Sequence, residues 1–243
     1  MADAPILVTG GAGFIGSNIA DRLAGEGHDV IVYDALTRPG VERNLAWLQS
    51  RHGHRITLVQ ADIRDRDALG RAISDVQAVF HMAAQVAVTT SMDDPRDDLE
   101  INILGTFNLL EALRAKGDAT PLVFASTNKV YGDLADLDFA REGDTYVPTD
   151  ADVRAHGIGE ARPLDFHTPY GVSKGAADQY VLDYARSFGI PAAVLRMSCI
   201  YGQRQMGTED QGWVAHFLIR ALEGRPITLY GDGYQVRDIL DVS

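Results

Sequence analysis

The chain has 243 residues, is 46% hydrophobic and carries a formal net charge of −12 at pH 7. Such a chain is typical of a globular protein with a sizeable core, and its acidity excludes a broad basic surface for nucleic acid or for an anionic membrane. We therefore expect small-molecule partners, no nucleic acid and no membrane. No metal site is expected either. The only cysteine, Cys199, excludes an internal disulfide framework and predicts a cytoplasmic protein. The opening residues, Met1-Ala-Asp-Ala-Pro5, lack the basic and apolar segments of a signal peptide.

The first motif is a short apolar strand, Ile6–Thr9, followed by the glycine-rich turn GGAGFIG and a helix-period segment. In such a unit the first glycine makes the tight turn and the second lets backbone amides approach a pyrophosphate. The third glycine allows close packing of the helix on the strand. The cofactor-contact candidates here are Gly10, Gly13, Phe14, Ile15 and Gly16.

A second strand, residues 30–33, ends in Asp34, about 20 residues after the glycine turn. An acid at this place binds the adenosine ribose hydroxyls of a dinucleotide, and its charge repels a 2′-phosphate. NAD is therefore favoured over NADP. Arg38 is close enough in the chain to accept such a phosphate, which keeps NADP as the alternative.

Two further strands, Ile56–Gln60 and residues 78–82, supply more candidates for the cofactor. Asp62, followed by Ile63, either meets the adenine amino group or caps the helix expected from residue 66 to residue 73. Ala83 and Ala84 follow the fourth strand, and their small side chains leave room for a cofactor or simply pack closely.

Later in the chain we expect strands over residues 122–125, 192–196 and 227–230 and a helix over 213–222, with a polar, mobile segment over 133–162 covering the site. Alternating strands and helices predict an α/β fold, a Rossmann-type doubly wound parallel sheet. A helix over residues 99–116 and another from about residue 170 each carry more apolar positions than one sheet face requires. Paired across a two-fold axis, they predict a homodimer with a four-helix bundle.

Chemistry is indicated at Tyr170 and Lys174, which share a helix face at a spacing of four residues. A lysine ammonium beside a phenol favours the phenolate, so we expect the pKa of Tyr170 to fall towards neutrality. A hydroxyl at the tip of the fifth strand, Thr127, faces the crevice where ligands bind in open α/β sheets.

This order of motifs resembles the extended short-chain dehydrogenase/reductase family, the NAD-dependent epimerases and dehydratases, over essentially the whole chain. Four stretches are similar to nucleotide-sugar epimerases of that family: residues 85–91 (QVAVTTS), 126–133 (STNKVYGD), 164–180 (LDFHTPYGVSKGAADQY) and 204–213 (RQMGTEDQGW). The resemblance implies an NAD-dependent enzyme in which Thr127, Tyr170 and Lys174 are catalytic. It also implies that Tyr170 and Lys174 contact the cofactor.

The resemblance also distinguishes between reactions. Dehydratases of the family have an Asp-Glu pair directly after the catalytic threonine, whereas this chain has Asn128 and Lys129. Epimerisation of a nucleotide-diphosphate sugar through a transient keto sugar is therefore favoured over loss of water. The nucleotide base, the sugar and the epimerised carbon stay open.

The expected substrate contacts also come from the resemblance. Arg204 and Arg237 stand on late loops where the family holds the diphosphate, and arginine suits bidentate phosphate recognition. The alternative is that both are surface residues in contact with solvent. Gln85, Thr89 and Thr90 are candidates for sugar contacts, with capping and packing as the alternative.

We expect residues 1–198 to form the dinucleotide-binding domain and 199–243 to form part of a substrate-binding portion. Members of the family continue for roughly another small half-domain, so we expect that portion to be truncated. A binding module that holds NAD without turning over a sugar is the rival hypothesis.

Overall fold

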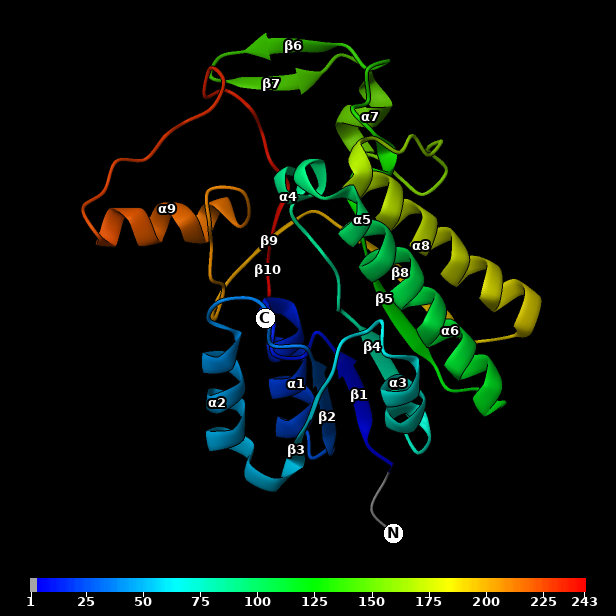
Figure 1. Ribbon diagram of the computed structural model, residues 1–243. Helices are drawn as coiled ribbons and strands as arrows, with labels where there is room; N and C mark the ends of the chain where they lie inside the picture. Colours follow the sequence, from blue (N-terminus) through cyan, green and yellow to red (C-terminus); the bar gives the residue numbers. More distant parts are fainter. Residues whose placement is uncertain (1–3) are drawn as a thin grey trace.

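The computed structural model describes residues 4–243 and confirms the predicted α/β fold class. Residues 1–3 of the segment without a signal pattern lie outside this range. Six parallel strands form the central sheet (Figure 1) in the order β3-β2-β1-β4-β5-β8. Their bounds are β1 Ile6–Thr9, β2 Val30–Asp34, β3 Ile56–Gln60, β4 Ala78–His81, β5 Leu122–Thr127 and β8 Ala192–Met197. From β1 the chain adds β2 and β3 on one side, and β4, β5 and β8 then follow on the other side of β1. A crevice opens between β1 and β4, where the strand order reverses.

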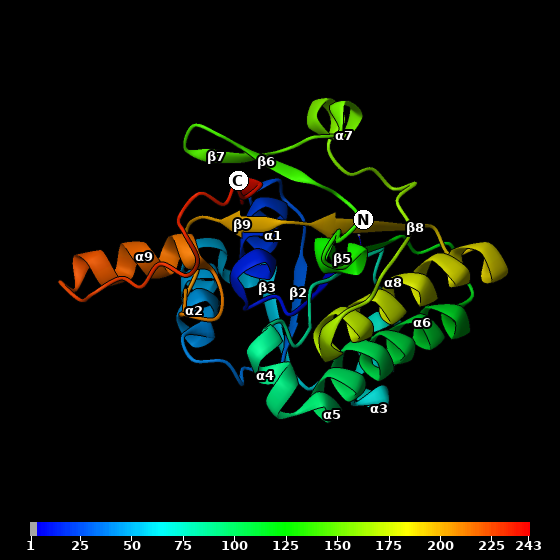
Figure 2. The same ribbon diagram turned by 90° about the horizontal axis from the view of Figure 1, so that it is seen from above.

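Helices cover both faces of the sheet, and each face has its own core (Figures 1 and 2). Adjacent residues of β1 show the division, because Leu7 packs in one core and Val8 in the other, as the alternation of a strand requires. The helices on the Val8 side are α1, Phe14–Gly25, and α2, Val41–His52. Those on the Leu7 side are α3, Arg66–Ile73, α6, Gly105–Lys116, and α8, Thr168–Phe188.

The helix predicted over residues 99–116 is not uniform. Its first part, Leu99–Leu104, is π-helical and follows the short helices α4, Val88–Asp93, and α5, Pro95–Asp98. Single π-helical turns within α-helices occur often at functional sites. Here the π-helical turn carries Asn102, a buried residue whose side chain contacts the segment after β4.

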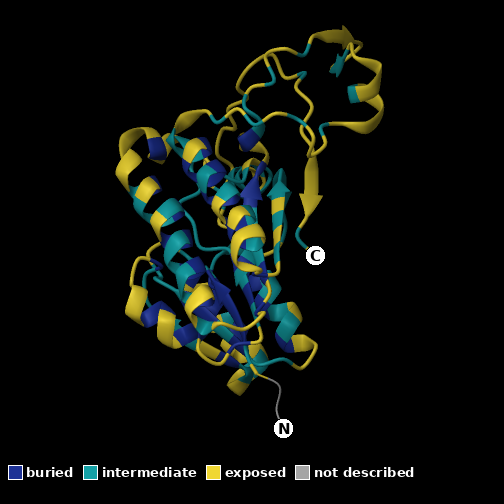
Figure 3. Ribbon diagram, turned by 90° about the vertical axis from the view of Figure 1, so that its right-hand side faces the viewer, coloured by how far each residue is buried: buried dark blue, intermediate teal, exposed yellow. Residues whose placement is uncertain are grey.

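The segment over residues 133–162 contains a hairpin and a helix and is mostly exposed (Figure 3). Its elements are β6, Phe139–Glu142, β7, Thr145–Pro148, and α7, Ala151–His156. Short 3-10 turns occupy Gly53–Arg55 and Asn128–Tyr131. None of the helices in the described part of the chain combines the length and apolarity needed to cross a membrane.

The predicted strand over residues 227–230 is wrong. This apolar run is an exposed loop with no partner strand in the described range, and an isolated extended segment leaves its backbone groups to water. Instead, β10, Ile239–Asp241, pairs in parallel with β9, Cys199–Tyr201, and the predicted helix α9 is present over Trp213–Leu222.

Candidate active site

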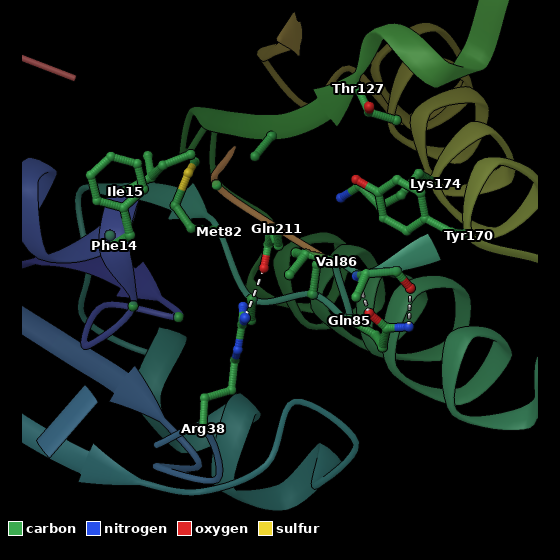
Figure 4. Close-up of a pocket in the computed structure, with 18 of the residues that line it drawn as sticks. Phe14, Ile15, Arg38, Met82, Gln85, Val86, Thr127, Tyr170, Lys174 and Gln211 are labelled. Carbon is green, nitrogen blue, oxygen red and sulfur yellow. Dashed lines mark hydrogen bonds between the residues drawn. The ribbon is translucent and has the colours of Figure 1, made fainter. Parts of the chain in front are cut away.

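A cavity of about 700 Å³ lies at the carboxyl ends of the central strands (Figure 4). This volume is in the range of small-molecule sites in proteins. All the cofactor and catalytic candidates line it together: Gly10, Gly13, Phe14, Ile15, Gly16, Asp34, Arg38, Asp62, Ile63, Ala83, Ala84, Thr127, Tyr170 and Lys174.

The glycine turn brings the start of α1 close to the cavity. Gly10 has a φ of +64°, and a Cβ on it would lie 2.7 Å from the backbone nitrogen of Ala83. A Cβ on Gly16 would lie 2.1 Å from the backbone oxygen of Gly10. A Cβ on Gly13 would have only the backbone oxygen of Gly10 within 4 Å, at a distance of 3.1 Å. The turn therefore leaves space in front of the first N–H groups of α1, as a bound pyrophosphate requires.

The Asp34 carboxylate is held at the end of β2 by two backbone N–H groups. Ala12 N donates to Oδ2 at 3.0 Å and Leu36 N donates to Oδ1 at 2.9 Å. A fixed carboxylate on the cavity wall can accept hydrogen bonds from ribose hydroxyls. The guanidinium of Arg38 is already engaged, because its Nη2 donates to Gln211 Oε1 at 2.7 Å (Figure 4). These contacts fit NAD better than NADP.

Asp62 is held by an arginine at the edge of the cavity. Arg64 donates from Nη2 and Nε to the carboxylate at 2.7 and 2.9 Å, and this pairing lowers the pKa of Asp62. The helix-cap alternative for Asp62 is wrong, because Asp65 caps α3 by accepting from the N–H groups of Asp67 and Ala68.

A buried acid on α8 sets the positions of the catalytic candidates. Asp178 accepts from Ser126 Oγ at 2.7 Å and from Arg196 Nε and Nη2 at 2.9 and 3.0 Å. These bonds tie α8 to β5 and β8. Since Ser126 precedes Thr127, they fix the Thr127 hydroxyl relative to Tyr170 and Lys174, which lie one to two turns earlier on α8 (Figure 4).

Burial dominates the electrostatics of this group. The pKa of Tyr170 is raised by burial, with the Thr127 hydroxyl opposing part of the rise. Burial also lowers the pKa of Lys174 to about 7, and its Nζ lies 4.3 Å from the centre of the Phe124 ring. The expected fall in the pKa of Tyr170 is therefore wrong, because burial disfavours the charged phenolate and raises this pKa.

The buried lysine predicts a pH dependence of stability. The unfolded chain keeps the ordinary lysine pKa of 10.5, so it binds more protons than the folded chain between about pH 7 and 10.5. The buried ammonium of Lys174 therefore lowers the stability of the folded protein most below pH 7, and stability increases as the pH rises through this window. In the natural chain this effect should raise the free energy of unfolding by on the order of 2–5 kcal/mol across the window. We expect Lys174→Met to lack this rise. Urea unfolding of both proteins without ligand at pH 7 and pH 9.5 measures the difference, and equal pH dependence in the two would contradict the prediction.

Only some of the residues expected to contact the substrate line the cavity. Gln85 and Thr90 line the cavity, whereas Thr89, Arg204 and Arg237 do not. The side-chain amide of Gln85 is already used: Nε2 donates to Ala87 O at 2.9 Å and to Asp98 Oδ2 at 3.0 Å, and Oε1 accepts from Ala87 N at 2.5 Å. Gln85 therefore holds the shape of the segment after β4. Arg237 is exposed on the loop before β10.

Sequence reasoning missed one side of the cavity. The end of β8 and the start of β9, residues 197–200, line it together with Gln205, Gln211 and Trp213. The rule used for Thr127, that residues after a parallel strand face the crevice, applies equally to residues 197–200 and could have found them. Nothing in the spacing of Gln205 or Gln211 reveals that their loop returns to the cavity. Within residues 4–243, no cluster of three or more metal-ligating side chains is present.

The strand order, the glycine turn with its acid at β2, and the Thr127, Tyr170 and Lys174 group define a dinucleotide-dependent enzyme. Residues 6–243 match the model of the NAD dependent epimerase/dehydratase family, and the chain belongs to that family. Its cofactor is accordingly NAD.

Among curated proteins, the chain is 46% identical to CDP-paratose 2-epimerase of Salmonella typhi, over 97% of this chain and 70% of that protein. Two solved structures are similar as well. UDP-glucose 4-epimerase of Thermotoga maritima with UDP-glucose has a TM-score of 0.79 at 34% identity, covering 98% of this chain and 69% of that one. UDP-glucose 4-epimerase of Thermus thermophilus in complex with NAD has a TM-score of 0.79 at 36% identity, covering 98% and 70%.

Proposed function

We propose that the protein is an NAD-dependent nucleotide-sugar epimerase that inverts C2 of a CDP-sugar, as a CDP-paratose 2-epimerase does. The observation that carries the proposal is a single cavity lined by Thr127, Tyr170 and Lys174 and also by Asn128 and Lys129. The latter two stand where a dehydratase needs two carboxylates, so this cavity has no acid pair at that place. The 46% identity with the Salmonella typhi enzyme supports the choice of C2 and of cytidine.

In this mechanism Tyr170 moves one proton. Its phenolate takes the proton of the sugar hydroxyl, aligned by the Thr127 hydroxyl, and returns the proton after the keto sugar has turned over. NAD, when bound, supplies the electron acceptor and donor, so that the reaction has no net redox change. Because burial raises the pKa of Tyr170, the phenolate needs a cation close by, and Lys174 supplies it in its ammonium form. Lys174 also lines the cavity, and in this proposal it contacts the cofactor as well.

A UDP-glucose 4-epimerase activity is the second candidate, favoured by the two similar crystal structures. It uses the same proton transfer and differs in which sugar carbon faces Tyr170. A non-catalytic NAD-binding module is the third.

A panel of nucleotide sugars separates these candidates. CDP-paratose, UDP-glucose and a dTDP-sugar are incubated with the protein and NAD, and NMR of the sugar protons reports inversion at C2 or C4. We expect inversion of the CDP-sugar at C2. Inversion at C4 of the UDP-sugar supports the second candidate, and no inversion of any sugar contradicts an epimerase.

The division at residue 198 fits the fold, because the last strand of the main sheet, β8, ends at Met197 and β9 pairs outside that sheet. We assign residues 1–198 to the NAD-binding domain and 199–243 to part of the substrate-binding portion. The single cysteine supports a reducing, cytoplasmic location.

The proposed homodimer uses the outer faces of the segments around α6 and α8. Both present exposed apolar side chains, and such side chains gathered on adjacent helices are typical of a subunit interface. They are Leu99, Leu104, Val172, Tyr180 and Phe188. Light scattering after size-exclusion chromatography is expected to give twice the chain mass at micromolar concentration. A monomer mass would contradict the dimer.

A further inference from the structure

A loop that we call the strap, residues 202–212, forms one wall of the cavity. Its residues Gln205, Gln211 and Gly212 line the same space as the glycine turn and Asp34. The strap therefore faces the part of the cavity that is shaped for a dinucleotide. Its other contacts tie it to α1 and α2 and to the loop between β2 and α2.

One end of the strap is fastened by Arg204. Its Nη2 donates to Asn18 Oδ1 on α1, and its guanidinium carbon lies 3.9 Å from the centre of the Trp47 ring on α2. Asn44, also on α2, donates from Nδ2 to the backbone oxygen of Arg204 at 3.3 Å. The arginine predicted to bind substrate phosphate thus points to the two helices that start the fold.

The other end is fastened beside Asp34. Arg38 Nη2 donates to Gln211 Oε1 at 2.7 Å, and Figure 4 shows this bond crossing the cavity region. Met206 packs on Gly40, where a Cβ would lie 2.9 Å from Met206 Cγ. Both ends of the strap are therefore attached to the half of the fold that binds the dinucleotide.

The strap is held in an unfavourable conformation. Arg204 has a φ of +69°, in the left-handed region that non-glycine residues rarely adopt. Within the described chain its Nε is buried without a hydrogen-bond partner, and so is Gln205 Oε1 on the cavity wall. Strain and unpaired buried groups persist where the surroundings enforce them, which is characteristic of ligand clamps.

We propose that the strap retains bound NAD and sets its rate of release, with Arg204 and Gln211 as the two fasteners. The proposal rests on the proposed function, because an epimerase returns its cofactor to the starting state in each cycle and has no need to exchange it. A closed strap then slows dissociation of the dinucleotide without entering the chemical step.

Release of NADH tests the proposal directly. Protein loaded with NADH is mixed with excess NAD in a stopped-flow instrument, and the loss of bound-NADH fluorescence gives the dissociation rate. We expect Arg204→Ala and Gln211→Ala each to release NADH at least tenfold faster than the natural chain. Arg186→Ala, which removes an exposed arginine near the end of α8 that does not line the cavity, is the matched control and is expected to change the rate less than twofold.

Dissociation within twofold of the natural rate in both strap variants would overturn the proposal. If Arg204→Ala does not fold, as circular dichroism would show, Gln211→Ala decides the question alone. No sugar is present in this measurement. An unchanged release rate in the variants thus rejects the proposed role of the strap and does not affect the epimerase proposal. Conversely, failure to invert any sugar rejects the epimerase proposal and does not affect the release measurement.

Discussion

Tyr170→Phe is expected to lower the turnover of CDP-paratose by about 10²–10⁴-fold, the usual contribution of a positioned acid/base group. The substitution removes one hydroxyl from a ring that lines the cavity beside Thr127 and leaves the apolar contacts of the ring in place. The loss should therefore fall on kcat, because the proton of the sugar hydroxyl has no acceptor of comparable position. Initial rates by NMR at saturating substrate measure it, and NADH fluorescence should show that cofactor binding is kept.

Tyr180→Phe is the matched control for this prediction. Tyr180 lies on the same helix, is 43% exposed and does not line the cavity. Its hydroxyl has no place in the proposed proton transfer, so the control should retain full turnover. Turnover of Tyr170→Phe within about tenfold of the natural chain would reject the acid/base role.

Gly16→Ala is expected to weaken NAD binding by roughly 100-fold and to destabilise the fold by about 3 kcal/mol, the upper part of the usual cost of overpacking. The added Cβ would lie 2.1 Å from Gly10 O and 2.8 Å from Gly11 Cα, and neither backbone atom can rotate away. The clash is relieved by moving α1 off the turn, which also moves its N–H groups away from the pyrophosphate. Calorimetric titration with NAD and urea unfolding measure the two effects.

Gly70→Ala controls for the loss of a helical glycine. Gly70 lies inside α3 with no heavy atom within 4 Å of an added Cβ, so alanine there should stabilise the protein by about 0.5–1 kcal/mol. NAD affinity should not change. If Gly16→Ala binds NAD as tightly as Gly70→Ala does, close packing at Gly16 is not required for the site.

The sequence was informative wherever a local pattern has a single structural solution. Period-2 and period-3.6 patterns predicted the central strands and main helices, and the rule that ligands lie at strand tips placed Asp34, Ala83 and Thr127 on one cavity. The run over residues 227–230 has the same local pattern without a neighbouring strand, and it is a loop. A strand depends on a partner that its own residues do not specify.

The sequence was less informative about long-range contacts. Gln85 was expected to meet the sugar, but its amide is used by Ala87 and by Asp98, thirteen residues later. Arg204 was expected to meet phosphate, but it contacts Asn18 and Trp47, which are more than 150 residues earlier in the chain. A side chain's available partners follow from the neighbours that folding brings to it.

By itself, the sequence determined the fold class, the NAD-type glycine turn with its acid, and the set of groups able to move a proton, because these depend on residue type and short spacing. Only the tertiary structure decided the pKa values of those groups. Burial raises the pKa of Tyr170 and lowers that of Lys174, which reverses the expectation drawn from their spacing alone. The reason is that desolvation depends on the whole surrounding fold, whereas the attraction inferred from spacing depends on two residues.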